Sequence, residues 1–198
     1  MKLAGVKLLT LVVVTGMTCG QQTSSPAAPG AAAEESAVCK SARLPVDLQD
    51  RLNKEFTSWH IQEPATLSAH AKERWRAEKP LECPGLAVGK FETDTSKSYV
   101  VLLVPAASKE GGYRLVAFST MPNQHGYEQR LIEASSSDGA NLFIRRVTFD
   151  KFFDEQSRRR FGIYTKEGFL LVDSGENEYE SDVYFWVKDH YQHEPVDY

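Results

Sequence analysis

The hydrophobic pattern divides the chain into four stretches. A mostly apolar run occupies residues 8–14, and a stretch without large apolar side chains follows at residues 21–37. Apolar residues then recur three or four positions apart up to residue 78, and in continuous or alternating runs from residue 86 onward. A period of about 3.6 predicts amphipathic helices, and a period of two predicts half-buried strands. The pattern therefore predicts helices first and strands afterwards.

Two helices are predicted. Leu48 and Leu52 recur on one helical face and indicate a helix over residues 46–56. A second helix is expected over residues 67–78, with Thr66 as its N-cap and a Lys-Pro pair ending it.

The remaining chain predicts a series of strands divided by turn residues. Glycine-containing segments at residues 109–112 and 137–139 fit hairpin connections. Helices followed by hairpins indicate an α+β fold, in which one or two N-terminal helices pack on a meandering antiparallel β-sheet. The expected strands are Leu86–Phe91, Tyr99–Val104, Tyr113–Ser119, Glu128–Ala134, Asn141–Thr148, Gly162–Thr165, Phe169–Asp173 and Glu178–Lys188.

The N-terminus has the order of a secretory signal. Lys2 and Lys7 precede the apolar run, and small residues and Cys19 follow it. The run is too short to cross a bilayer, which takes about 20 apolar residues. Residues 1–19 are therefore expected to be a signal peptide, lipoprotein-like because Cys19 stands where a bacterial lipoprotein carries its lipid.

The stretch behind the signal predicts a flexible tether. Residues 20–37 are rich in Ala, Ser, Pro and Gly, which cannot bury enough surface to order the chain. The alternative to lipid attachment is an ordinary signal-peptidase cut after Gly20 or within residues 31–33. Residues 38–198 are expected to form a single globular α+β domain, because 41% hydrophobic and 25% charged residues are typical of globular chains.

The cysteine count supports an oxidising compartment. If Cys19 carries a lipid, Cys39 and Cys83 remain as an even pair, and we expect them to form one disulfide. The alternative is two separate buried thiols. A catalytic cysteine is the weakest reading, because no base partner stands near either residue in sequence.

The charge balance disfavours one class of partner. The net charge of −4 provides no basic field for a phosphate backbone. We therefore expect no nucleic acid partner, and we interpret the arginines at 145–146 and 158–160 as solvated charge.

One segment resembles a known family. Cys83-Pro-Gly-Leu-Ala-Val-Gly-Lys-Phe-Glu-Thr-Asp94, followed by Ser98-Tyr-Val-Val-Leu-Leu103, is similar to a group of uncharacterised bacterial envelope proteins and lipoproteins distantly related to FG-GAP or VCBS-type repeats. Short stretches at residues 56–59 and 183–186, with Tyr191, also look like that group.

The resemblance departs from the calcium-binding pattern. Calcium takes 6–8 oxygen ligands, whereas the chain has Lys90 in place of the leading acid and Ser98 in place of the closing one. Glu92 and Asp94 alone are too few. We therefore read the segment as a hairpin without an ion, and we expect no metal or other cofactor.

Few residues suggest chemistry. His190 and His193, beside Asp189, would share a helical face but diverge on a strand, and this region is read as a turn and a terminal strand. Carboxylates alternate along residues 178–182, which favours the wet face of a strand. Trp59 and Trp75 are most simply core residues on helical faces.

Aromatic side chains near the end of the sheet are the remaining binding candidates. Tyr184, Trp186 and Tyr191 are expected either to form an exposed patch for a sugar, a peptide or a partner protein, or to be covered by a helix.

These observations favour an exported, lipid-anchored envelope protein that acts as a non-enzymatic binding or structural module. Its expected location is the outer membrane or periplasm, or outside the cell if Cys19 carries no lipid, and its expected partner is an envelope protein or glycan. The alternatives are a cell-wall-directed hydrolase or hydrolase inhibitor, with a site assembled from distant residues, and a calcium-dependent adhesion fragment.

Overall fold

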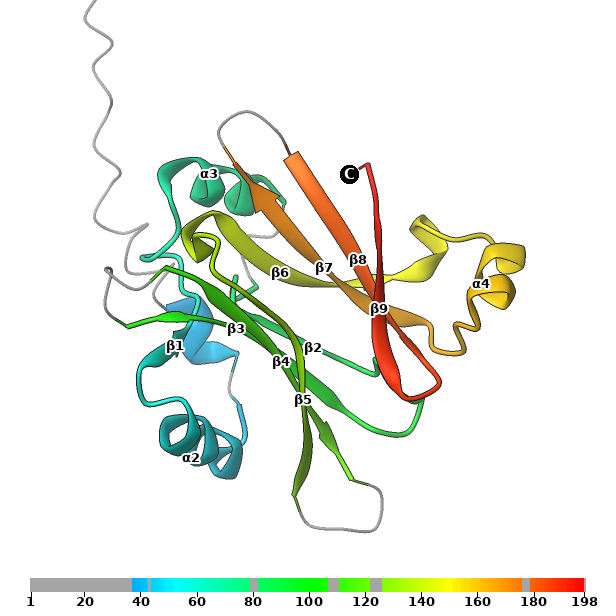
Figure 1. Cartoon of the computed structure of the whole chain (residues 1–198), viewed down its shortest axis with the longest axis horizontal. Helices are drawn as coiled ribbons and strands as arrows, with labels where there is room; N and C mark the ends of the chain where they lie inside the picture. The colour runs from blue at the N-terminus through cyan, green and yellow to red at the C-terminus, as the bar shows by residue number, and fades with distance from the viewer. Residues whose placement is uncertain are drawn as a thin grey trace, which may run out of the picture.

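The computed structural model describes residues 37–42, 44–78, 82–106, 111–121, 126–175 and 179–197, with only the backbone of Tyr179. The signal peptide, Cys19 and residues 20–36 of the expected tether lie outside this part. The described chain has a few helices and two antiparallel sheets, so the predicted α+β class is confirmed (Figure 1).

The first sheet has the strand order β1-β3-β4-β5, with β2 also paired to β3. Residues 59–61 and residues 86–89 both pair with the same edge of β3, one after the other. The strands are β1 (Trp59–Ile61), β2 (Leu86–Gly89), β3 (Ser98–Pro105), β4 (Tyr113–Thr120) and β5 (Tyr127–Ser135). The hairpin expected around residues 90–97 is confirmed, because β2 and β3 run antiparallel.

The second sheet is a four-stranded meander in the order β6-β7-β8-β9. Its strands are β6 (Leu142–Thr148), β7 (Glu167–Ser174), β8 (Tyr179–Val187) and β9 (His190–Pro195). The chain therefore changes sheets between β5 and β6. The hairpin expected at residues 137–139 is wrong: Asp138 instead caps the short 3-10 helix η1 (Gly139–Asn141), accepting a hydrogen bond from the N–H of Ala140.

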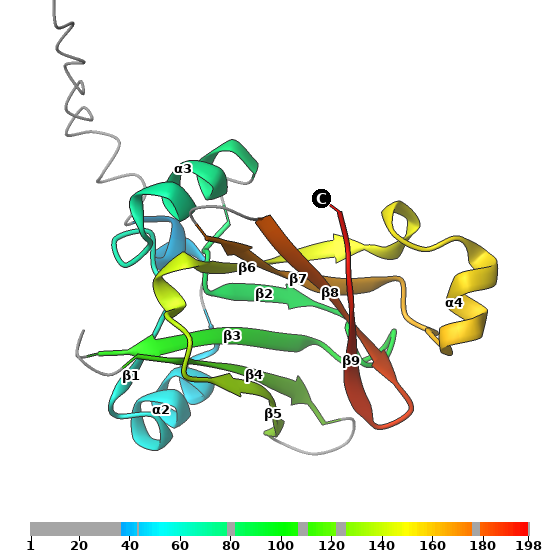
Figure 2. The same cartoon turned by 45° about the horizontal axis from the view of Figure 1, so that its top comes forward.

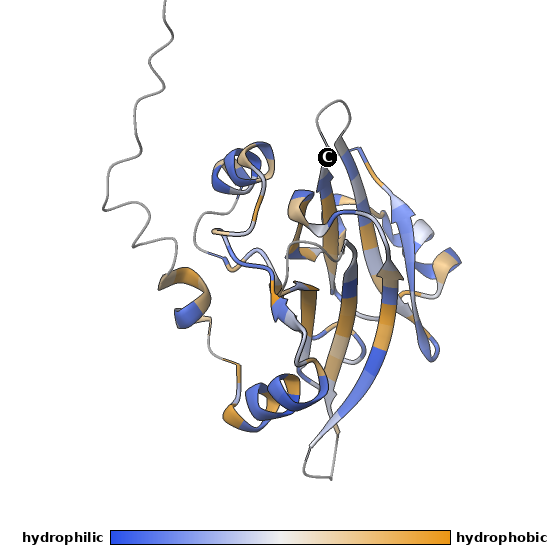
Figure 3. Cartoon of the chain, turned by 60° about the vertical axis from the view of Figure 1, so that its left-hand side comes forward, coloured by the Kyte–Doolittle hydropathy of each residue, from blue (hydrophilic) through white to orange (hydrophobic). Residues whose placement is uncertain are grey.

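The two sheets face each other, and helices cover their outer faces (Figure 2). Helix α2 (Val46–Glu55) packs on the first sheet, and α3 (Ala69–Glu78) packs on the second. Leu102 faces the second sheet, whereas its neighbours Val101 and Leu103 face α2. This alternation gives the sandwich three apolar layers, and Figure 3 shows apolar positions along the central strands.

Buried Gln62 joins the two sheets. Its side-chain amide donates hydrogen bonds to the carbonyls of Gly139 and Leu142, and its amide oxygen accepts one from Thr66. All of these groups are therefore satisfied inside the fold, where an unpaired polar group would be costly.

The sequence predicted Thr66 as the N-cap of the second helix, and this prediction is wrong. The hydroxyl of Ser68 accepts a hydrogen bond from the N–H of Ala71 and takes that role. The first helix ends at Glu55, so Trp59 belongs to β1 rather than to a helical face.

The segment at residues 162–165, expected as a strand, instead follows helix α4 (Glu155–Phe161). Gly162 ends the helix in the left-handed conformation at φ +73°. The N–H groups of Gly162 and Ile163 donate to the carbonyls of Arg159 and Arg158, the pattern of a Schellman motif. The strand expected over residues 162–165 is therefore wrong, because this segment forms the C-terminal cap of α4.

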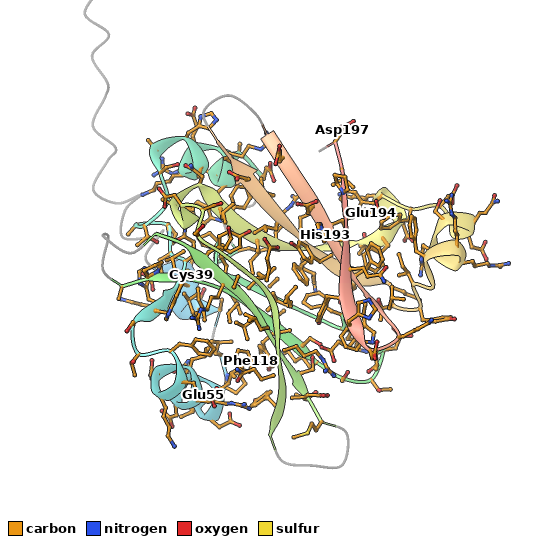
Figure 4. The ribbon with its side chains drawn as sticks, in the orientation of Figure 1. Cys39, Glu55, Phe118, His193, Glu194 and Asp197 are labelled. Carbon is orange, nitrogen blue, oxygen red and sulfur yellow. A yellow bond between two sulfur atoms is a disulfide. The ribbon has the colours of Figure 1, made fainter. Side chains whose placement is uncertain are left out.

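The predicted disulfide between Cys39 and Cys83 is present. Cys39 lies in a helical stretch at residues 37–41 and is labelled in Figure 4. Val38 packs in the core under α3, whereas Cys39 contacts the core under α2. The disulfide therefore attaches residues 37–41, which contact both outer apolar layers of the sandwich, to Cys83.

Candidate functional site

The aromatic residues singled out in the sequence gather where β5 meets β8 and β9. Tyr184 and Trp186 lie on the face of β8 that points between the sheets, while Val183 and Phe185 point to the opposite core. The ring of Tyr184 stacks on Phe169 at 4.9 Å between centroids. The side chains of β8 therefore divide between two faces, each packed against other elements.

An irregularity in β5 brings two charged residues to this place. The pairing with β4 shifts between Leu115 and Val116, so one residue of β5, Ile132, has no partner in the register. A bulge of this kind re-aims the side chains beyond it. Arg130 before the bulge and Glu133 after it both point between the sheets.

Glu133 accepts hydrogen bonds from two tyrosine hydroxyls. Tyr113 donates to one carboxylate oxygen and Tyr184 to the other. Burial raises the pKa of both phenols well above the ordinary value, and Glu133 raises it further, because a phenolate beside a carboxylate is unfavourable. Both tyrosines therefore remain donors throughout the physiological range.

A second carboxylate, Glu92, closes the same end of the sandwich. It accepts a hydrogen bond of 3.1 Å from the hydroxyl of Tyr191, and its oxygen lies 3.4 Å from Nε of Arg130. The guanidinium of Arg130 sits 4.7 Å from the ring centroid of Trp186 and 2.6 Å from Glu128. Burial, followed by Glu92, raises the pKa of Tyr191.

The aromatic group is thus largely internal. Tyr184 is only 2% exposed, so the expectation of an exposed patch is wrong for this residue, while Trp186 and Tyr191 are half-buried. Polar side chains of β5 and of the loop before β3 supply hydrogen bonds and an ion pair at this end, and no helix among the described residues caps it. The bonding pattern is that of a closure between two sheets.

The histidines separate as expected for a strand. His193, labelled in Figure 4, stacks on Tyr184 and lies 3.2 Å from Asp182. His190 instead bonds to Asp189 at 3.0 Å. His125, Glu176 and Glu178 lie outside the described residues.

The alternating carboxylates are only partly on a wet face. Glu180 is exposed, but Asp182 is half-buried and Asp173 stands directly opposite Glu180 in the register. Burial, and then the charge of Glu180, raises the pKa of Asp173.

The calcium-like segment directs its acids differently. Glu92 serves the closure described above, and Asp94 is exposed. Within the described part of the chain, no group of three or more His, Cys, Asp or Glu side chains is placed to hold a metal ion. Over the same residues, no helix has both the length and the apolar character needed to cross a membrane.

Two hollows flank β1. The larger, about 560 Å³, lies where the chain changes sheets and is lined by His60, Gln62, Asp138 and several glycines. The smaller, about 240 Å³, lies between α2 and β1. Apolar side chains such as Leu52, Phe56 and Trp59 line it together with the polar side chains of Gln49, Asn53 and His60. His60 lines both of them.

Sequence reasoning missed the residues that carry this geometry. Arg130 and Glu133 read as ordinary polar positions of an alternating strand, and only the bulge places both between the sheets. Arg114 and Trp59 come from β4 and β1, and their stacking at 4.6 Å has no local sequence signal.

Comparison of the chain with protein-family models, curated proteins and solved structures finds no match.

Proposed function

We propose that the chain is an exported envelope protein, anchored through a lipid on Cys19, whose domain is a non-enzymatic binding or structural module. The observation that carries the proposal is the disulfide between Cys39 and Cys83. Stable disulfides form mainly in oxidising compartments such as the periplasm.

The position of the disulfide supports a tethering role. It joins the first described segment of the chain to Cys83, which lies three residues before the start of β2 at Leu86. A mechanical force applied to the chain before Cys39 is therefore transmitted to the sandwich through the disulfide. The helical residues 37–41 do not have to resist that force by non-covalent packing alone. That arrangement suits a domain held at a membrane by its N-terminus.

The test is the chemistry of the mature N-terminus. The full chain is produced in a bacterium that processes lipoproteins, and the membrane fraction is analysed by mass spectrometry. We expect a diacylglyceryl group on Cys19, and no free thiol at Cys39 or Cys83 before reduction. The matched variant Cys19→Ala, which cannot carry the lipid, is expected to be absent from the membrane fraction.

Two results would count against this proposal at different levels. A free amine at a later residue supports ordinary signal peptidase and removes the lipid anchor. Recovery of the unprocessed chain from the cytosol, with both later thiols reduced, removes export altogether.

A cell-wall-directed hydrolase or hydrolase inhibitor is the second candidate. It is favoured by the larger hollow, because a histidine and a carboxylate, His60 and Asp138, line the same space. Such a pair is a common source of acid–base chemistry. The test is release of soluble fragments from purified cell wall, or inhibition of such release by an added hydrolase. Activity lost in both His60→Gln and Asp138→Asn supports this function, and the absence of activity in the parent chain removes it.

A further inference from the structure

A patch on the outer face of the first sheet lies beside the region covered by α2. We define the Trp59–Arg114 patch as Trp59, Arg114, Leu131 and Ala134. Arg114 pairs with Ala134 across β4 and β5 and with Leu103 across β3 and β4, so it lies on the α2 side of the sheet. Leu131, on the same side, is 61% exposed.

The smaller hollow opens beside this patch. Trp59 and Leu103 both line the hollow of about 240 Å³, and both neighbour Arg114. Leu52 and Phe56 form its other wall. A recess lined by apolar side chains together with Gln49, Asn53 and His60 is therefore continuous with half-buried Arg114.

Arg114 has a cation–π contact with Trp59 but no ion pair with any described carboxylate. Stacking on an aromatic face leaves the donors at the guanidinium edge free for a planar, two-point contact with a carboxylate. No lysine, arginine, aspartate or glutamate lines the hollow itself. Within the described part of the chain, the surface therefore combines a positive charge that has no ion pair with a partly apolar recess.

We propose that the Trp59–Arg114 patch docks a segment of a partner protein in which an apolar side chain is followed directly by an aspartate or glutamate. The apolar side chain fills the hollow against Trp59, and the carboxylate binds Arg114. Tryptophan and arginine are the residue types most enriched among energetically dominant interface positions. The proposal deepens the binding role proposed above and depends on that role alone, independent of export or lipid attachment.

The test uses the full chain and end-capped peptides. The probe is acetyl-Gly-Leu-Asp-Gly-amide, and its matched control carries Asn in place of Asp. Binding is followed by calorimetry and by tryptophan fluorescence, to which Trp59 contributes. We expect the aspartate peptide to bind at least about tenfold more tightly than the control, because a charge-assisted contact is lost in the latter.

Protein variants locate the contact. Arg114→Gln is expected to remove the preference for the aspartate peptide, and Arg114→Lys to retain part of it. Arg160→Gln is the control, because Arg160 is likewise an arginine over an aromatic ring, 5.9 Å from the centroid of Phe161, but is exposed. An unchanged urea midpoint in Arg114→Gln shows that the fold is intact.

Several outcomes overturn the proposal. Equal binding of the two peptides removes the role of the carboxylate, and an unaffected Arg114→Gln variant moves the site elsewhere. Self-association of the chain that Arg114→Gln abolishes assigns the patch to a second copy. Tighter binding of octanoate than of the peptide assigns it to a lipid carboxylate. None of these results alters the mass of the mature N-terminus, so the two proposals fail separately.

Discussion

Two arginine–tryptophan stacks with nearly equal distances involve opposite faces of the first sheet. Arg130 sits 4.7 Å from the ring centroid of Trp186, and Arg114 sits 4.6 Å from that of Trp59. The first points between the sheets, where Glu92 and Glu128 neutralise its charge. The second is on the outer face and has no carboxylate partner among the described residues.

The comparison shows that the surroundings, rather than the pair itself, decide what the stack does. Around Arg130, the Glu92 side chain is only 7% exposed and also accepts the hydroxyl of Tyr191, so removing one group leaves another buried without its partner. Arg114 has no comparable ion pair or shared acceptor among the described residues. It can therefore bind a carboxylate from another molecule without breaking an existing ion pair of those residues. The inner stack is therefore structural, and the outer one is available for binding.

The largest effect is expected from the inner stack. Glu92→Ala removes the acceptor of the Tyr191 hydroxyl and leaves Arg130 with the more exposed Glu128 as its remaining described partner, and we expect a loss of about 2–3 kcal/mol in the free energy of unfolding. Urea unfolding measures it. The control Glu128→Ala removes the other, 52% exposed, partner of Arg130 and is expected to cost less than about 1 kcal/mol. Equal losses in both variants would break the comparison.

The tyrosines around the inner closure give a pH dependence. The pKa of Tyr184 is raised, so above the ordinary tyrosine value of 10.0 the unfolded chain releases a proton that the folded chain keeps. Stability is therefore fully present below that value and falls as pH rises beyond it.

Tyr184→Phe tests this sign. At neutral pH the variant is expected to lose about 1 kcal/mol, because Glu133 loses one donor. As the pH rises above 10.0, the free energy of unfolding of Tyr184→Phe is expected to decline less steeply than that of the parent chain. Thermal unfolding across an alkaline series measures both effects, and parallel curves for the two proteins contradict the assignment.

A smaller effect of opposite sign is expected at Asp173. Its raised pKa means that ionisation disfavours the folded state once the pH passes the ordinary value of 3.8. Asp173→Asn removes this penalty and the repulsion from Glu180 directly opposite. We expect a gain of roughly 0.2–1 kcal/mol at neutral pH that disappears in acid below the ordinary value. A constant difference across the pH range would show that ionisation is not the cause.

The smallest effect is expected from the outer stack. Arg114→Gln is expected to change the free energy of unfolding by less than about 0.5 kcal/mol, because no buried polar group among the described residues takes Arg114 as its partner. Urea unfolding of the variant, run beside Glu92→Ala, completes the comparison. A loss similar to that of Glu92→Ala would make the outer stack structural as well.

Local periodicity predicted most individual elements. The helix expected over residues 46–56 is observed as Val46–Glu55, and the strand expected from Tyr99 to Val104 extends by one residue at each end. The disulfide also followed from the cysteine count. These features depend on residues close in sequence or on residue type alone, which a single chain displays directly.

The candidate sites were not predictable in the same way. Trp59 continues the helical spacing of Leu52 and Phe56, yet β3 captures it as a strand because residues 103–105 offer an open edge. Glu92 looked like a remnant calcium ligand, and only the approach of Tyr191 and Arg130 shows its actual bonds.

The sequence by itself determined the α+β class, most of the helices and strands and which strand residues are apolar, and it favoured a bond between Cys39 and Cys83 over two separate thiols. The tertiary structure decided that the strands form two sheets, that the bulge turns Arg130 and Glu133 into the same space, and that Arg114 pairs with no carboxylate of the described residues. The physical reason is range: periodicity and turn chemistry act over a few residues, whereas strand partners and ion pairs depend on groups that meet only after the chain has folded.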